Sequence, residues 1–438
     1  MKINLSTEIL SIMGRQILDS RGIPTVEVDV TLPNGVCGRA SVPSGASTGS
    51  YEAFEKRDDC PTLYQGKSVL QAVKLINTEI SSKLVGMDAM DQKKIDRVLC
   101  QLDGTQNKGR LGANAILSVS QAVCVAASNA YNMPLFRYIG GLGAVTMPTP
   151  LINILNGGVH ADNELVIQEF MIVPYGADSF STAVRMGAEI FYKLRENMRS
   201  LGYGANVGDE GGLAPRLGTS EEALDYILMA IESAGYTPGN DVALALDVAA
   251  SEFYTVEGEA KKGYYLYGRD KDPLSVDDMV SVYMSLLKRY PIVSIEDAFH
   301  EDDWLGWREL TRKTHDQCQL VGDDLFVTNS GRITKGIQEE SANAVLIKLN
   351  QVGTVTEAIE TVIYAKSQKY ATIVSHRSGE TESSYIADFS VGTNSNQIKI
   401  GSMCRSDRLA KYNQLLRIEE YLGREAHFSG KSDFLFNK

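Results

Sequence analysis

A short apolar run that ends in a carboxyl group, VALALD, occupies residues 242–247. Similar runs recur after residue 150, and most are followed by a charged or hydrogen-bonding residue. We count eight such segments: Leu151–Leu155, Val166–Val173, Val242–Leu246, Ile292–Ile295, Gln319–Val321, Ala344–Leu349, Ala371–Val374 and Gln397–Ile400. The later segments are followed at intervals of about 23 to 28 residues by Glu296, Asp323, Lys348, His376 and Lys399. Such an interval fits one strand and one helix, and eight strands predict a (β/α)8 barrel.

The first two segments depart from this regular alternation. Only residues 156–165 lie between them, too few for a crossover helix, so we expect the two strands to pair as an antiparallel hairpin. Two helical stretches, Ser179–Ser200 and Ser220–Ala234, then precede the third strand. The predicted fold class is therefore α/β, with a barrel of the order β-β-α-α-(β-α)6.

The N-terminal third has a different pattern. Thr25–Val30 alternates with a period of two, and Pro33–Gly35 supplies a turn into a second strand. From about residue 67 to residue 131 apolar side chains recur at helical spacing. We therefore predict a smaller α+β capping domain at residues 1–140 and the barrel domain at residues 141–438.

Composition limits the classes of ligand and location. The chain of 438 residues carries 43 Lys and Arg against 55 Asp and Glu, a net charge of −12, which argues against nucleic acid as its main ligand. The six cysteines are scattered, so we expect free thiols in a reducing compartment. No signal-peptide pattern is visible, and no stretch approaches the roughly 18 apolar residues of a membrane span. We expect a cytoplasmic protein without a membrane span; surface display or secretion cannot be read from the sequence.

Three carboxyl groups end successive strands of the predicted barrel, at Asp247, Glu296 and Asp323. One of them alone would more simply cap the helix after its strand. Three together at the C-terminal rim would repel one another unless a cation lay between them. Oxygen ligands without His or Cys favour a hard ion such as Mg²⁺.

Later strands end in cationic groups. Lys348 and Lys399 follow apolar runs, where an isolated lysine would commonly be ion-paired or extend to solvent. At the same rim, a lysine near Mg²⁺ and a second lysine should have a lowered pKa, which suits a general base. His376, Arg377 and Ser378 follow the seventh strand and suit the binding of an anionic phosphate or carboxylate.

Four loops add polar groups, although none of them is specific on its own. SGASTG at residues 44–49 has the composition of a turn, or of a lid whose Ser47 hydroxyl reaches a metal on closure. GDEGG at residues 208–212 places Glu210 among glycines. The other two loops contribute His160 and the pair Gln168-Glu169.

The combined motifs resemble the enolase family almost from end to end. They are SGASTG, GDEGG, IED, SHRSGE and RLAKYNQLLRIE, in the order the family has them, together with RQILDSRG at residues 15–22. The resemblance implies a glycolytic and gluconeogenic lyase, phosphopyruvate hydratase, that interconverts 2-phosphoglycerate and phosphoenolpyruvate. It also implies a barrel with a capping domain, two Mg²⁺ ions in each site (one conformational, one catalytic) and a homodimer or octamer.

Residue roles follow from the matched motifs. The resemblance implies Asp247, Glu296 and Asp323 as metal ligands, with Ser47 completing the second Mg²⁺ site. It implies Lys348 as the base for the C2 proton and Glu210 as the acid, which calls for a raised pKa, with Glu169 and His160 beside it. Arg377 and Ser378 correspond to phosphate contacts, and Gln168, His376 and Lys399 to further substrate contacts.

Four residues near the site depart from the family pattern, and two other functions are possible alternatives to the lyase. Ala298, Leu213, Ile400 and Met403 replace usual residues near the site, which bears on turnover and affinity more than on the reaction class. One alternative is a surface binder of the plasminogen-binding type that retains the fold, consistent with the terminal Lys438, although such a lysine is usually just solvated. The other is a sugar-acid dehydratase, which the phosphate-type motifs disfavour.

Overall fold

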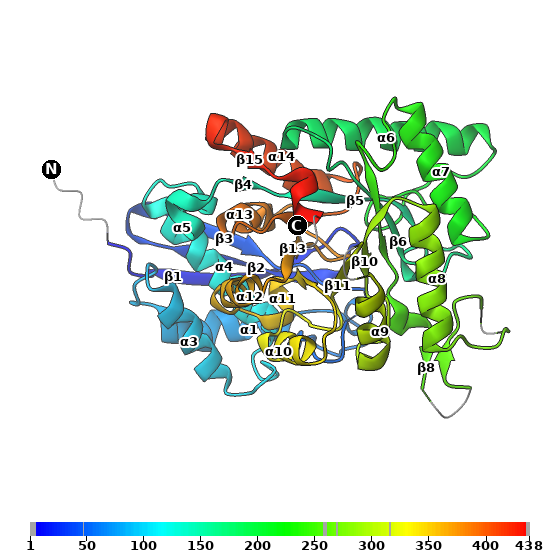
Figure 1. The fold of residues 1–438 in the computed structure, drawn as a ribbon. Coiled ribbons are helices and arrows are strands. Elements are labelled where there is room, and N and C mark those ends of the chain that lie inside the picture. Colours follow the sequence, from blue (N-terminus) through cyan, green and yellow to red (C-terminus); the bar gives the residue numbers. More distant parts are fainter. Residues whose placement is uncertain (1–5, 47, 257–260, 269, 315–316, 435–438) are drawn as a thin grey trace.

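The computed structural model describes residues 6–46, 48–256, 261–268, 270–314 and 317–434. In the described residues, an eight-stranded barrel closes in the order β10-β11-β12-β13-β14-β5-β6-β7. Strands β5 and β6 pair antiparallel, as do β6 and β7, and the other neighbours are parallel. The predicted fold class and the β-β-α-α-(β-α)6 order are therefore confirmed (Figure 1).

The barrel elements follow one another along the chain with helices on the outside. They are β5 (Thr149–Asn156), β6 (Glu169–Val173), α6 (Phe180–Ser200), α7 (Ser220–Ser233), β7 (Ala243–Asp247), α8 (Val276–Arg289), β10 (Ile292–Glu296), α9 (Trp304–Thr314), β11 (Gln319–Gly322), α10 (Ser330–Gln338), β12 (Ala344–Ile347), α11 (Leu349–Val352), α12 (Val355–Ser367), β13 (Ala371–Ser375), α13 (Tyr385–Gly392), β14 (Gln397–Lys399) and α14 (Ser406–Leu422). Two short pairs, β4 (Thr146–Met147) with β15 (His427–Phe428) and β8 (Tyr254–Thr255) with β9 (Gly263–Tyr264), lie outside the barrel sheet.

Three predicted strands are shorter than expected, and the one predicted as Gln397–Ile400 loses only its last residue. The segment predicted from Val166 becomes a strand only at Glu169, because the backbone before it bonds to the loop at Gly157 and Gly158. The segment predicted to reach Leu349 ends at Ile347, where the Lys348 N–H donates to the Thr328 hydroxyl and a short helix begins.

The first part of the chain forms a three-stranded antiparallel sheet and helices. They are β1 (Ser11–Leu18), β2 (Pro24–Thr31), β3 (Cys37–Ser41), α1 (Leu70–Leu75), α2 (Ser81–Leu84), α3 (Gln92–Asp103), α4 (Ala113–Ala130) and α5 (Leu135–Gly140), with a π-helical segment Ile76–Ile80 between α1 and α2. Strand β1 was missed in the sequence. The division of the domains at residue 140 stays a prediction.

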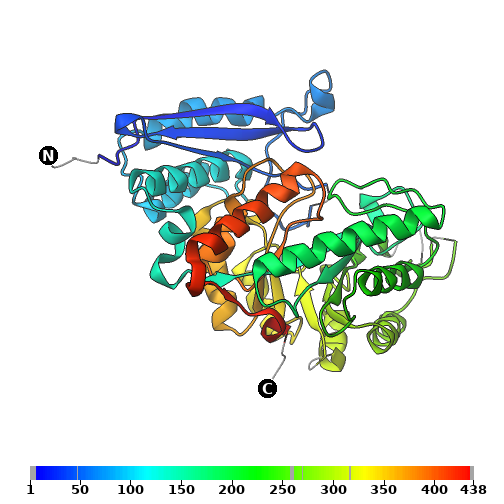
Figure 2. The ribbon, with the colours of Figure 1, turned by 90° about the horizontal axis from the view of Figure 1, so that it is seen from above.

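Helix α4 lies between this sheet and the barrel (Figure 2). Nearly all of its side chains are buried, since the helix packs on β2 and β3 on one side and on α11 and α12 on the other. Gly38 of β3 permits this close approach: a Cβ there would lie 2.2 Å from the Ala122 carbonyl oxygen.

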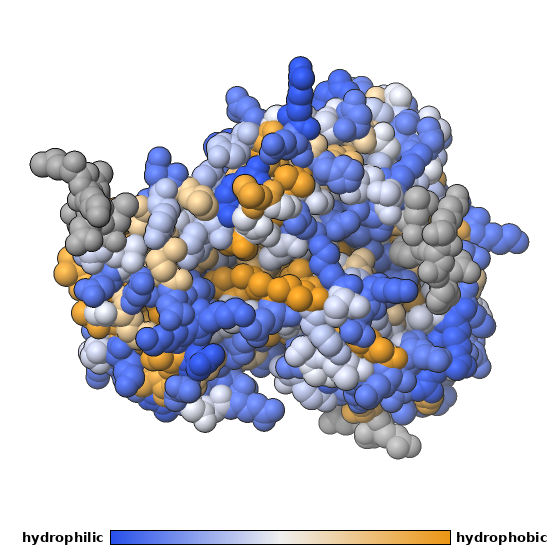
Figure 3. Space-filling view, turned by 60° about the vertical axis from the view of Figure 1, so that its left-hand side comes forward, coloured by the Kyte–Doolittle hydropathy of each residue, from blue (hydrophilic) through white to orange (hydrophobic). Residues whose placement is uncertain are grey.

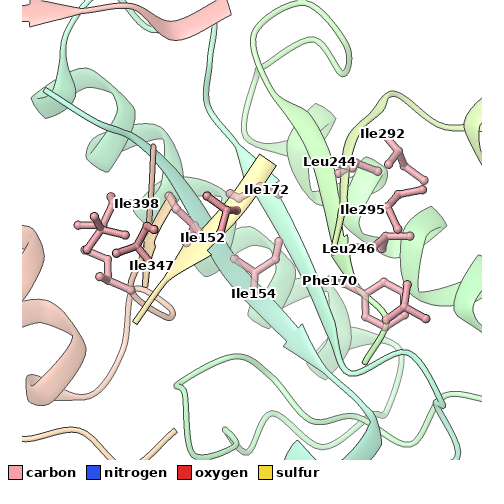
Figure 4. Close-up of a cluster of buried hydrophobic side chains, with 14 of the residues drawn as sticks. Ile152, Ile154, Phe170, Ile172, Leu244, Leu246, Ile292, Ile295, Ile347 and Ile398 are labelled. Carbon is pink, nitrogen blue, oxygen red and sulfur yellow. The ribbon is translucent and has the colours of Figure 1, made fainter. Parts of the chain in front are cut away.

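The period of two along each barrel strand separates the core from the site. Ile152, Phe170, Leu246, Ile347 and Ile398 belong to the hydrophobic cluster between strands and helices (Figure 4). Smaller apolar clusters contain alternate residues of the same strands, Leu151, Met171, Val173, Ala243, Ala245, Ala344 and Leu346. By this alternation Glu169, Asp247, Lys348 and Lys399 share the inner face of the barrel, at one rim.

The surface is mainly hydrophilic on the face in Figure 3, where hydrophobic residues form a strip in a central depression. None of the helices in the described ranges combines the length and hydropathy needed to cross a membrane. All six cysteines are free thiols, as expected.

Replacement of Gly38 by Ala should lower the free energy of unfolding by about 1–3 kcal/mol, because the added methyl group overpacks the contact with α4. Gly143→Ala is the matched control, since nothing lies within 4 Å of a Cβ at that position. Thermal denaturation followed by circular dichroism measures the difference. Equal midpoints for the two variants would contradict the packing argument.

Candidate active site

A lysine ammonium holds the carboxyl groups at the barrel rim together. Lys399 Nζ lies 2.8 Å from Asp247 Oδ2, 3.0 Å from both Glu296 carboxylate oxygens and 3.4 Å from Glu169 Oε2. Strand register explains this convergence, because Glu169 pairs with Asp247 and Asp247 pairs with Glu296 on adjacent strands. All four side chains are buried.

A second lysine pairs with the third predicted metal ligand. Lys348 Nζ contacts Asp323 Oδ2, while Gln351 Nε2 donates to Asp323 Oδ1 at 2.9 Å. Asp297 is also close, since its carboxylate accepts the backbone N–H groups of Asp323 and Asp324 at 3.0 and 2.9 Å. The structure thus brings together Asp247, Glu296 and Asp323 around two ammonium groups, at one end of the barrel.

Glu210 lies among imidazoles on the loop between α6 and α7. Its Oε2 accepts from Asn153 Nδ2 at 3.0 Å and is 3.4 Å from His376 Nε2, and its Oε1 is 3.9 Å from His160 Nδ1. His160 Nδ1 is also 3.6 Å from Glu169. The two glutamates therefore share one histidine.

The loop after β13 meets the capping domain. Arg377 forms a buried two-point ion pair with Glu52, at 2.8 and 3.1 Å, and also donates to Asn350 Oδ1. The Ser378 hydroxyl accepts the Ala46 N–H at 2.6 Å. The glycine-rich loop is thereby held against the predicted anion-binding residues, although Ser47 itself lies outside the described residues.

One cavity unites most of these groups. Its volume is about 40 Å³. Its walls include His160, Gln168, Glu169, Glu210, Asp247, Asp323, Lys348, His376, Arg377, Ser378 and Lys399. Glu296 is not among the lining residues and reaches the group through its contact with Lys399. All the predicted site residues that the structure describes are therefore found together.

Family models account for nearly the whole chain. The model described as "Enolase, N-terminal domain" matches residues 9–139, and "Enolase, C-terminal TIM barrel domain" matches residues 144–436. The chain belongs to the enolase family. Its family and barrel place it among the lyases of the enolase superfamily.

The excess of carboxyl groups in this enolase site perturbs their pKa values. Burial, reinforced by the Glu210 charge, raises the pKa of Glu169 well above its usual range. Burial and the Asp247 charge do the same to the pKa of Glu296. The raised pKa values show that the positive charge nearby only partly compensates the burial of these carboxyl groups. Their oxygen donors are of the type that suits Mg²⁺, and among the described residues Asp323 has ligand atoms close enough to share one ion with Asp297 and Asp324.

The pKa shifts of Lys348 and Glu210 each result from opposing influences. Burial, the largest single influence, lowers the pKa of Lys348, but the carboxylates around it, Asp323 first and Glu296 after it, together raise the pKa above its usual value. Burial, the largest single influence, raises the pKa of Glu210, but His376, His160 and Arg408 together hold the pKa well below the usual range. The expected low pKa of Lys348 presupposes a nearby Mg²⁺ and stays a prediction. The expected high pKa of Glu210 is wrong for this arrangement of charges, whereas the pKa values of Glu169 and Glu296 are raised.

Several contacts escaped the sequence analysis. Asn153 was visible as a polar residue inside an apolar strand, and Gln351 as an amide three residues after Lys348. Glu52 had no signal beyond its place after the glycine-rich loop. The departures from the family pattern are packing residues: Ala298, Leu213 and Ile400 are fully buried in the main core, and Met403 packs against it.

Mg²⁺ should stabilise the wild-type protein by about 2.7 kcal/mol when its concentration is 100 times Kd, because it binds only the folded site. Asp247→Asn should lose most of this gain, while the surface variant Asp178→Asn should keep it. A thermal shift measured with and without Mg²⁺ provides the test. A wild-type midpoint that does not respond to Mg²⁺ would rule out this metal site.

Proposed function

We propose that the chain is an Mg²⁺-dependent enolase that converts 2-phosphoglycerate reversibly to phosphoenolpyruvate and water. The observation that carries the proposal is the cavity in which Lys348, Lys399, Glu210, Arg377 and Ser378 meet two of the predicted metal ligands, Asp247 and Asp323. The third, Glu296, contacts Lys399 from outside the cavity wall. An elimination needs a base and an acid, and the cavity contains a candidate for each, Lys348 and Glu210.

Substrate binding is assigned to the cationic and polar groups. Arg377 and Ser378 are the proposed phosphate contacts, and the Glu52 pair orients the guanidinium for them. His160, Gln168, His376 and Lys399 are the proposed contacts to the rest of the substrate. Asp247, Glu296 and Asp323 would hold the conformational Mg²⁺, and Ser47 would join the catalytic one. Bound Mg²⁺ would supply the positive charge that stabilises an enolate next to a carboxylate.

Proton removal is assigned to Lys348. Its neutral Nζ takes the C2 proton, the C2–H electron pair moves into the carboxylate, and Lys399 stabilises the added negative charge. Lys348 can be neutral only when the Asp323 carboxylate no longer favours the ammonium form, and engagement of Asp323 with a cation would have that effect.

Loss of hydroxide is assigned to Glu210, assisted by Glu169 and His160. The C3–O bond breaks, a proton passes to the departing oxygen, and the electron pair from C2 forms the C2=C3 double bond. Glu210 must acquire a proton before this step. The imidazoles beside it and Glu169, whose pKa is raised, are the groups positioned to share one.

The proposal extends to a cytoplasmic homodimer or octamer acting in glycolysis and gluconeogenesis. No described residue gives separate support to a plasminogen-binding role, and Lys438 lies outside the described residues.

The wild-type enzyme should generate phosphoenolpyruvate absorbance from 2-phosphoglycerate, and EDTA should abolish the signal because it removes Mg²⁺ from the carboxylates. Restored Mg²⁺ should recover the rate. Failure of wild-type protein to form phosphoenolpyruvate in excess Mg²⁺ would refute the proposed reaction. A panel of unphosphorylated sugar acids should give no product.

Lys348→Ala should slow the exchange of the substrate C2 proton with deuterated solvent by about 10²–10⁴-fold, the usual contribution of a general base. Substrate binding should remain measurable by calorimetry, because the phosphate contacts are intact. Lys313→Ala, a change of an exposed lysine on α9, is the control. Exchange at the wild-type rate in Lys348→Ala would remove Lys348 from its role.

A further inference from the structure

Arg408 of helix α14 is fully buried beneath the candidate site. Its Nη1 donates to the Arg377 carbonyl oxygen at 2.6 Å and contacts His376 Nδ1. Its Nη2 donates to the carbonyl oxygens of Ser378 at 2.5 Å and Asp209 at 3.2 Å. One guanidinium thus joins the loop after β13 to the loop that carries Glu210.

The surroundings leave Arg408 little freedom to move. Gly401 has φ +80°, and a Cβ there would lie 2.7 Å from Arg408 Cδ and 2.8 Å from the Glu210 carbonyl oxygen. The Ser402 N–H donates to that same Glu210 carbonyl at 3.0 Å. Arg408 and the Glu210 backbone are therefore packed against one another through the turn after β14.

The contact with Arg408 determines where the His376 proton lies. A guanidinium only donates hydrogen bonds, so His376 Nδ1 must accept. A neutral imidazole then carries its proton on Nε2, the atom 3.4 Å from Glu210 Oε2. Burial lowers the pKa of His376 to about 4 against the opposing charge of Glu210, so the ring is neutral near pH 7.

We propose that Arg408 is a positioning residue for the reaction: it holds His376 in the Nε2–H tautomer, with that proton directed at Glu210. This inference deepens the proposed function, because it concerns the group assigned to hydroxide loss. Arg408 does not line the cavity and acts through His376. Its loss would leave three backbone carbonyls and one imidazole nitrogen without their donor.

The tautomer is measured directly by NMR on wild-type protein labelled with ¹⁵N only at its five histidines. The His376 signal is assigned by its disappearance in His376→Gln. We expect a protonated Nε2 and an unprotonated Nδ1. A wild-type His376 with its proton on Nδ1, or with both nitrogens protonated at pH 7, would overturn the proposal.

Arg408→Gln tests the link to turnover. We expect a mixture of His376 tautomers and a fall in kcat of about 10- to 100-fold, the usual effect of losing a supporting hydrogen-bond partner, with a smaller change in KM. Arg417→Gln, on the exposed side of the same helix, is the control and should match wild type. An unchanged tautomer, or a kcat within twofold of the control, would overturn the proposal.

Folding and the proposed function are tested separately. If Arg408→Gln fails to fold, as judged by circular dichroism, Arg408→Lys is measured by the same two criteria, because a single ammonium cannot reproduce the fork that reaches all four acceptors. If wild-type protein lacks enolase activity, the proposed function fails, while the wild-type tautomer still decides the role of Arg408 towards His376.

Discussion

The site depends on the neutralisation of carboxyl groups that the barrel forces onto one buried rim. Strand alternation leaves no choice about where Glu169 and Asp247 point once Phe170 and Leu246 face the helices. An unpaired buried carboxylate is very costly, and Lys399 offsets this cost by lying within 3.4 Å of three acids. The strand alternation that buries the apolar side chains therefore also brings the carboxyl groups together at the rim. Their combined negative charge favours the binding of a cation there.

The capping domain contributes to this site through one loop and one ion pair. Helix α4 is buried between sheet and barrel, so the capping sheet is held firmly against the barrel helices. From that base the loop after β3 reaches Ser378 and Gly379, and Glu52 meets Arg377 inside the protein. The Arg377 guanidinium is thus positioned by a residue from the other part of the chain. Under the proposed function, this contact would link substrate affinity to the packing between the two parts.

Periodic features were predictable from the sequence, and contacts between distant segments were not. The eight barrel strands and the residues at their ends follow from local alternation and spacing, which is why Asp247, Lys348 and Lys399 were found. Strand β1 was missed because its sequence, SIMGRQIL, does not alternate between apolar and polar residues: Gly14 is buried, whereas Met13 and Leu18 are exposed. The pairs Glu52–Arg377 and Arg408–His376 join positions 325 and 32 residues apart, and no local pattern marks them. The predicted pKa direction of Glu210 was wrong because the shift depends on the distances to charged neighbours, which the residue type alone does not give.

The pKa values of Lys348 and Glu210 have a common consequence under the proposed function. A base that is protonated and an acid that is ionised form the wrong pair of states for dehydration, and both are held there by neighbours: Asp323 for Lys348, and the imidazoles for Glu210. A cation bound to Asp323 would weaken the effect of that carboxylate on Lys348, which would lower the pKa of the lysine. Negative charge of the substrate near Glu210 would raise the pKa of that carboxyl group. Binding would then prepare both groups together, so that the reactive protonation states arise only in the loaded site. Arg408 would have a specific part in these events: by keeping the His376 proton on Nε2, 3.4 Å from Glu210 Oε2, it would place a donor beside the carboxyl group that must acquire a proton.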